Sequence, residues 1–169
     1  MTMRISAITL TDSSLIDKAC SFTVDKEVKV KNYHRMYKSE HSPIRTKMFW
    51  IEMYDIPSFV STHFVRHKFG VEHFVKSLRD DRGGTGTEDR MSPVNHAMLV
   101  NAQALINMAR KRLCTATHVE TQVVMLNIHD AIAALDPDLA RCMVVDCVYR
   151  GGCHEFHNCG FYEREVLNG

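Results

Sequence analysis

The feature that most constrains the fold is the run MFWIEMY at positions 48–54. It is nearly continuous in apolar and aromatic side chains and has the length of one β-strand. Such a run predicts a strand that is covered on both of its faces, so other elements must pack around it. Residues 3–10 mix apolar and polar positions and predict a second, shorter strand.

Helical spacing dominates the second half of the chain. Apolar positions recur every three or four residues at Met98, Ala102, Leu105, Ala109 and Leu113. A second amphipathic segment covers 118–135, and a last helix is expected from Asp136-Pro137 to about Val145. Shorter helices are expected after Asp12 or Ser13, over 26–38 and over 57–66, and a flexible loop over 80–93.

Length and charge limit the function classes. A chain of 169 residues predicts one domain spanning 1–169. The net charge of +1 argues against a general nucleic-acid coat and against a polybasic membrane binder. The first residues lack a long apolar core of a signal peptide, and no apolar run is long enough to span a bilayer, so we expect a cytoplasmic protein.

Positive charge is nevertheless concentrated in one stretch, THFVRHKFGVEHFVKSLR at 62–79. Arg66, His67 and Lys68 are consecutive, and Ser77 and Arg79 follow as a second pair. The planar guanidinium of arginine suits phosphate, and lysine adds a point charge. If the chain turns back after Gly70, both sets would face one anionic ligand, whereas the simpler alternative is a solvated basic edge.

Polar side chains also occur in the helix expected around 98–113. Asn101 and Arg112 are about three turns apart and would share a face, while Asn107 points elsewhere. Amide and guanidinium groups at the margin of a buried helix require partners. The helix is therefore expected either to be exposed there or to line a site between subunits.

These blocks carry a family resemblance. RHK at 66–68 is followed by eight residues and then by Ser77-Leu78-Arg79, and His41-Ser42-Pro43 stands before the apolar run. NAQALIN at 101–107 is followed by Lys111-Arg112. Over roughly 40–125, the chain resembles the flavin-dependent thymidylate synthases, as a short and divergent example.

The resemblance implies a fold and an assembly. The family has an α+β fold, with a mixed β-sheet packed with long helices, and forms homotetramers whose sites combine several subunits. By position, one set of residues would contact FAD: Ser42, Arg66, His67, Lys68, Asn101, Gln103 and Asn107. A second set would contact dUMP: His63, Ser77, Leu78, Arg79 and Arg112.

The resemblance also implies a methyltransferase reaction. dUMP would be methylated to dTMP, with methylenetetrahydrofolate as the one-carbon donor and NADPH-reduced FAD as the hydride source. Arg112 would be the catalytic residue, because a fixed cation can stabilise negative charge on the N3/O2 edge of the uracil ring.

Several positions depart from the family pattern of RHR, seven residues and Ser. Lys68 replaces the second arginine, the spacer before Ser77 has one extra residue, and Gln103 replaces an arginine. His63 stands where the family has a glutamine, and Arg45-Thr46 stand in place of a Glu-His pair. Two alternatives therefore stay open: a hydroxymethylase of pyrimidine nucleotides, and a nucleotide-binding homologue without catalysis.

Three cysteines near the C-terminal end are regularly spaced. Cys147, Cys153 and Cys159 have five residues between neighbours, with His154 and His157 in the second gap. Structural zinc sites usually contain C-x(2–4)-C pairs, which this spacing lacks. We therefore expect no metal site and favour reduced structural thiols, with zinc and a redox or disulfide role as alternatives.

Overall fold

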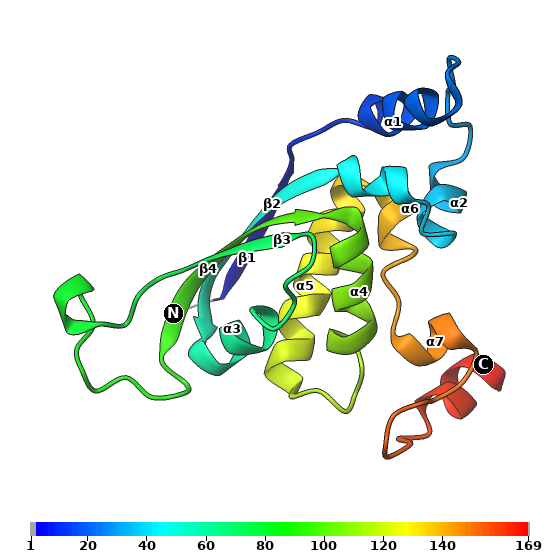
Figure 1. Ribbon diagram of the computed structural model, residues 1–169. Helices are drawn as coiled ribbons and strands as arrows, with labels where there is room; N and C mark the ends of the chain where they lie inside the picture. The colour runs from blue at the N-terminus through cyan, green and yellow to red at the C-terminus, as the bar shows by residue number, and fades with distance from the viewer. Residues whose placement is uncertain (1–2, 169) are drawn as a thin grey trace.

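The centre of the protein is one antiparallel sheet. The computed structural model describes residues 3–168. The sheet has the strand order β1-β2-β4-β3, in which the strands are β1 Arg4–Thr9, β2 Met48–Pro57, β3 Val71–Val75 and β4 Pro93–Asn101 (Figure 1). The α+β class is confirmed. The sheet is not mixed, however, because all three neighbouring pairs run antiparallel.

Helices cover one face of this sheet. The layer consists of α3 Ser58–Phe64, α4 Ala102–Arg112 and α5 Val119–Leu135 (Figure 1). Apolar side chains between the sheet and these helices form one buried cluster. The remaining elements are α1 Ser14–Val24, α2 Tyr33–Lys38, η1 Ser42–Thr46, η2 Asp80–Arg82, α6 Pro137–Ala140, α7 Asp146–Arg150 and η3 Glu163–Leu167.

The apolar strand β2 is covered on one face and not on two. Phe49, Ile51 and Met53 are buried, while the side chains between them are only half-buried. On the open face Trp50 lies against Phe74 of β3, with 5.4 Å between the ring centroids. Phe74 is 53% exposed, so this face of the sheet offers apolar surface to solvent.

The boundary between β4 and α4 corrects one prediction. Met98 was expected in the helix, but it points into the core from β4. The helix begins at Ala102, after Asn101 caps it by accepting a hydrogen bond from the backbone N–H of Ala104 at 2.9 Å. Met98 is an inward-facing position of β4 that lies four residues before Ala102, so its helical spacing to α4 is a coincidence.

Other helix predictions are confirmed in part. The predicted helices over 57–66 and 118–135 correspond to α3 and α5. Only the second half of 26–38 is helical, because Asn32 caps α2 by accepting from the N–H of Arg35 at 2.9 Å. The helix expected from 137 to 145 ends at Ala140.

The segment 76–92 between β3 and β4 extends away from the rest of the fold (Figure 1). Its turn requires glycine at position 84, since a Cβ there would lie 1.9 Å from the carbonyl oxygen of Leu78. The N–H of Gly84 donates to the carbonyl of Arg79 at 2.9 Å. Among residues 3–168, no helix has the length and apolar character needed to cross a membrane.

Candidate functional site

Arg112, the last residue of α4, is fixed against the end of α3. Its Nε donates to Nε2 of His67 at 3.0 Å, and its Nη2 donates to the backbone carbonyl of His63 at 2.6 Å. These contacts use two of the five N–H groups of the guanidinium. The half-buried side chain is therefore held in one orientation and keeps further N–H groups for a ligand.

His67 is neutral in this arrangement. Because its Nε2 accepts from Arg112, the proton of the ring must lie on Nδ1. Burial lowers the pKa of His67 to about 4, and the charges of Arg112 and His73 add to this effect. An imidazole that stays neutral at pH 7 can orient the arginine without adding to its charge.

A chain of hydrogen bonds continues from His67 into the core. Nε2 of His73 lies 2.8 Å from the carbonyl oxygen of His67, so it donates. Nδ1 of His73 lies 3.0 Å from Nε2 of His96, whose Nδ1 is 3.0 Å from the hydroxyl of Ser61. Where Nδ1 of His73 is the acceptor, Nε2–H of His96 donates to it and Nδ1 of His96 accepts from Ser61.

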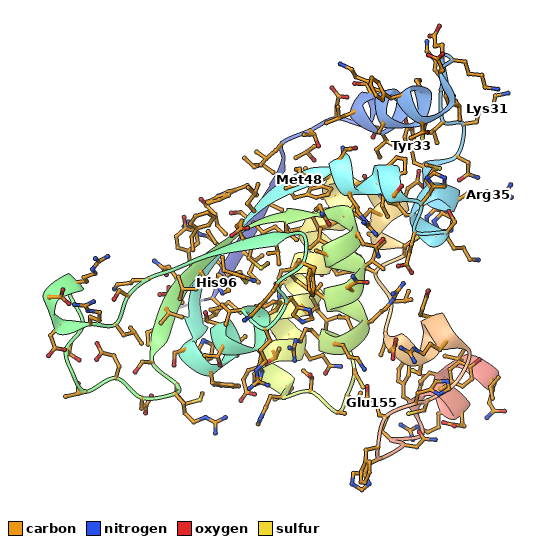
Figure 2. All side chains as sticks on the ribbon, in the orientation of Figure 1. Lys31, Tyr33, Arg35, Met48, His96 and Glu155 are labelled. Carbon is orange, nitrogen blue, oxygen red and sulfur yellow. The ribbon has the colours of Figure 1, made fainter. Side chains whose placement is uncertain are left out.

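His96 is the buried centre of this chain, and Figure 2 labels it on β4. Its side chain is 1% exposed, and burial followed by the charge of His73 lowers its pKa to about 4. The sequence analysis did not predict that the rings of His73 and His96 and the hydroxyl of Ser61 support the backbone of the RHK motif.

His63 is the second histidine that contacts Arg112. Its Nδ1 lies 2.8 Å from the hydroxyl of Thr121 on α5, and its ring stacks on His118 at 5.6 Å between centroids. Burial lowers the pKa of His63, and the charges of Arg112 and Arg66 contribute. Like His67, His63 therefore favours the neutral form.

The charge at this corner is not balanced within the chain. Arg66 is exposed near Arg112, and burial followed by the charge of Arg66 lowers the pKa of Arg112. Lys68 is exposed next to His67 in the chain. Within residues 3–168, none of these three cations forms an ion pair. A half-buried arginine with neutral partners and cationic neighbours fits an anionic ligand. We call Arg66, His67, Lys68 and Arg112 the basic corner.

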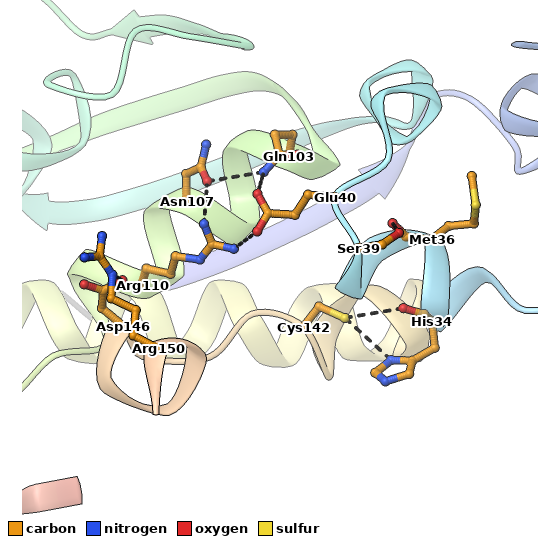
Figure 3. A network of polar contacts seen from close by, with 10 residues as sticks. All are labelled: His34, Met36, Ser39, Glu40, Gln103, Asn107, Arg110, Cys142, Asp146 and Arg150. Carbon is orange, nitrogen blue, oxygen red and sulfur yellow. Dashed lines mark hydrogen bonds and ion pairs between the residues drawn. The ribbon is translucent and has the colours of Figure 1, made fainter. Parts of the chain in front are cut away.

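Two predicted flavin contacts lie on another face of α4. Gln103 donates to Glu40 at 2.6 Å and to Asn107 at 3.3 Å, and Asn107 also accepts from Arg110 at 3.3 Å (Figure 3). Arg110 forms an ion pair with Glu40 and stacks over the ring of Tyr149. Burial would raise the pKa of Glu40, but hydrogen bonds from Arg110, Tyr149 and Gln103 lower it instead.

This Glu40 network does not fit a flavin contact as it stands, because Gln103 and Asn107 are already bound within the chain. Asn101 likewise has a structural role. Its side chain caps α4 and packs on Gly70, where a Cβ would lie 2.4 Å from Nδ2 of Asn101. Gly70 also has a φ of 74°, which favours glycine. The sequence analysis did not predict the pairing of Glu40 with Arg110, because nothing in residues 39–43 (SEHSP) indicates that Glu40 would contact α4.

The remaining predicted residues lie apart from the basic corner. Ser42 is exposed at the start of η1. Ser77, Leu78 and Arg79 belong to the projecting segment 76–92, where Arg79 pairs with Asp81 at 2.9 Å. The chain does turn at Gly70, but it then enters β3. The structure thus brings His63, His67 and Arg112 together and does not bring Ser77 or Arg79 to them.

Comparisons with known proteins address the fold. The sequence matches no family model and no curated protein. Solved structures do match: Thymidylate Synthase X (ThyX) from Helicobacter pylori with FAD and dUMP has a TM-score of 0.68 at 12% identity, covering 84% of this chain and 99% of that chain. The chain has the fold of the flavin-dependent thymidylate synthases. The resemblance drawn from the RHK, NAQALIN and Ser-Pro blocks is therefore confirmed at the level of the fold.

Two further structures agree. A UMP/dUMP methylase, PolB from Streptomyces cacaoi bound with 5-Br dUMP, has a TM-score of 0.64 at 13% identity and covers 83% of this chain and 94% of its own. A second ThyX structure from Helicobacter pylori, complexed with FAD and dUMP, has a TM-score of 0.65 at 12% identity, with coverage of 82% and 99%. The ThyX fold extends across most of the chain.

Proposed function

We propose that the chain is a ThyX-like enzyme that binds FAD and dUMP and methylates dUMP to dTMP. The observation that carries this proposal is Arg112, which is oriented by His63 and His67 and has no ion-pair partner within residues 3–168. Its support from known structures is the ThyX fold, since the similar proteins were solved with FAD and dUMP or with 5-Br dUMP.

Arg112 would act on the uracil ring. Its free N–H groups would bind the N3/O2 edge and stabilise negative charge there, which makes C5 more nucleophilic. His67 would hold the guanidinium in place through Nε2, and the His73–His96–Ser61 chain would hold the His67 backbone. His63 and its neighbour His118 would limit water at one side of the ring.

Arg66, His67 and Lys68 would hold the anionic part of FAD, because they supply cationic and N–H groups at the surface of the same corner. Bound and reduced FAD would be the source of the hydride. Methylenetetrahydrofolate would supply the one-carbon unit, and NADPH the electrons. A cytoplasmic location and a single domain over 1–169 remain part of this proposal.

The assembly would be a homotetramer whose sites combine subunits. Two observations support it: Arg79 lies on a projecting segment apart from Arg112, and the outer face of the sheet exposes Ile8 and Phe74. Ser77 and Arg79 of one copy would then hold the nucleotide phosphate beside Arg112 of another. Light scattering of the purified protein would measure the mass of the assembly.

Absorbance and turnover test the proposal together. The purified protein is desalted after addition of FAD, and release of tritium from C5 of labelled dUMP is followed with methylenetetrahydrofolate and NADPH. We expect retained flavin bands, at about one flavin per chain, and tritium release that depends on dUMP and folate. A protein that neither retains flavin nor releases tritium from dUMP would overturn the proposal.

Lys68 and the longer spacer before Ser77 favour a second candidate on the same fold. The chain would then bind the nucleotide and either hydroxymethylate it or leave it unchanged. Mass spectrometry of the nucleotide after incubation separates the three cases, because methylation, hydroxymethylation and no reaction give different product masses.

A further inference from the structure

The C-terminal segment 147–168 lacks a hydrophobic anchor. None of its described side chains is buried, and Phe156 is 95% exposed. Only α7 and the turn η3 are regular, and the rest is irregular. Segments that bury so little apolar surface usually depend on a disulfide or a metal ion for a fixed structure.

Ion pairs tie this segment to α4 but contribute little. Nζ of Lys111 lies 2.8 Å from Glu155 and 3.6 Å from Asp146, and Figure 2 labels Glu155 near the end of α4. The Lys111 side chain is 52% exposed. Exposed pairs of this kind typically stabilise by less than about 1 kcal/mol. Arg110 of α4 also stacks over the ring of Tyr149 in α7, but residues 151–168 lie beyond that contact.

Four of the six cysteines meet where the segment approaches α4. Cys114 follows the end of α4, Cys147 lies in α7, and Cys153 and Cys159 lie in the irregular part. All four line one cavity of about 50 Å³. This volume is of the order of one or two water molecules, so it suits a single ion better than an organic ligand.

The four thiols are close enough to influence one another. Burial raises the pKa of Cys114, and Glu155, Cys159 and Cys153 raise it further. Burial also raises the pKa of Cys147, with smaller contributions from Cys114 and Cys153. The hydroxyl of Thr115 donates to Sγ of Cys159 at 2.9 Å. All four cysteines have free thiols.

We propose that Cys114, Cys147, Cys153 and Cys159 together bind one divalent ion of the Zn²⁺ class and thereby fasten the C-terminal segment to the end of α4. Four thiolates are a common ligand set of structural zinc sites, and thiolates select zinc among the abundant divalent ions. This set would be unusual in lacking a C-x(2–4)-C pair, so the fold and not the local sequence would bring the ligands together. Each thiol would release its proton to solvent on binding.

This proposal revises the expectation of no metal site. That expectation considered the spacing of three cysteines alone, and the structure adds Cys114 as the fourth. Among the described residues, no three His, Cys, Asp or Glu side chains are yet arranged to hold an ion, so the thiols must rotate inward. Cys153 and Cys159 lie outside any helix or strand, and metal binding is commonly coupled to local ordering of such segments.

Metal analysis provides the test. The protein is purified under reducing conditions without chelator and its zinc content is measured. We expect about one zinc per chain, and a loss of at least half of it in Cys114→Ser and in Cys159→Ser. Cys20→Ser and Cys142→Ser are matched controls, because these thiols lie outside the cavity, and both should retain zinc.

Cobalt binding keeps the test valid if a serine variant fails to fold. Co²⁺ added to the metal-free wild-type protein should give the intense visible bands of tetrahedral thiolate coordination, and Zn²⁺ should abolish them. Wild-type protein that holds no zinc and gives no such bands would overturn the proposal. So would equal zinc in Cys114→Ser and wild type, or a thiol count showing that these cysteines form disulfides.

Discussion

Arg110 and Arg112 are two residues apart on α4 and have opposite electrostatic surroundings. Because they lie roughly 200° apart around the helix, they face different neighbours. Arg110 is paired with Glu40, hydrogen-bonded to Asn107 and stacked on Tyr149. Arg112 touches an imidazole and a backbone carbonyl, and lies near Arg66. The first arrangement is complete within the chain, whereas the second leaves a positive charge for a ligand to neutralise.

The contrast between the two arginines predicts the largest effect, on catalytic turnover, for Arg112→Ala. This variant should lower turnover of dUMP about 10²–10³-fold, the range for loss of one fixed donor in an active site. Arg112→Lys is the matched control, since it keeps the charge and loses the planar geometry, and it should recover only part of the activity. Wild-type turnover in Arg112→Ala would show that this face of α4 does not contact the nucleotide.

Arg110→Ala should act on stability instead. It leaves the half-buried Glu40 carboxylate with Gln103 but without its cation, so the loss should be about 2–3 kcal/mol, below the range for a fully buried pair. Urea unfolding measures the change in the free energy of unfolding. Glu40→Gln with Arg110→Met in one chain should be milder than Arg110→Ala alone. A change below about 1 kcal/mol in Arg110→Ala would contradict the contrast between the two arginines.

The buried histidines predict how stability depends on pH. His96 has a pKa of about 4 in the folded protein and an ordinary value of 6.5. The unfolded chain therefore binds a proton first as pH falls. The stabilisation is present above pH 6.5 and is lost between 6.5 and about 4, by up to about 3 kcal/mol.

Urea unfolding at several pH values checks this slope. His96→Gln should flatten it, because glutamine does not titrate, and His129→Gln is a control at a half-exposed position. An unchanged slope in His96→Gln would mean that other groups dominate the acid response.

The smallest effect is expected for the stability of Arg79→Ala. Its pair with Asp81 is exposed, with 71% of the Arg79 side chain accessible, so its loss should change the free energy of unfolding by less than about 0.5 kcal/mol. The same variant should raise the KM for dUMP if Arg79 holds the phosphate. A large loss of stability would show that segment 76–92 packs more firmly than it does here.

The sequence predicted some parts of this site and not others, for physical reasons. The strands at 3–10 and 48–54 and the helix at 118–135 were predicted because their apolar patterns are local. Asn101 was misplaced inside a helix, because the inward Met98 of β4 happens to continue the helical spacing into α4. Local charge and polarity drew attention to Arg112 and His67, but their roles at the site were assigned through the resemblance alone.

Contacts between residues that are far apart in the chain could not be predicted from the sequence. Glu40 and Arg110 are 70 residues apart, and Cys114 joins a cluster that begins at Cys147. Neither pairing leaves a periodic pattern, because both depend on how α4 packs against the segments around it. In sequence, the RHK set at 66–68 and the pair Ser77 and Arg79 were expected to face one ligand. The strand β3 lies between them, and its pairing with β4 directs Ser77 and Arg79 away from the RHK set.

The most direct test of the account is subunit complementation. Arg112→Ala and Arg79→Ala are purified separately, mixed, unfolded and refolded together, and turnover of dUMP is measured against each variant refolded alone. If one copy supplies Arg112 and another supplies Arg79, some sites in mixed assemblies contain both native residues, and activity rises well above the average of the two variants. Activity equal to that average, in assemblies shown to be mixed, would contradict a shared site and place both residues in the site of one chain.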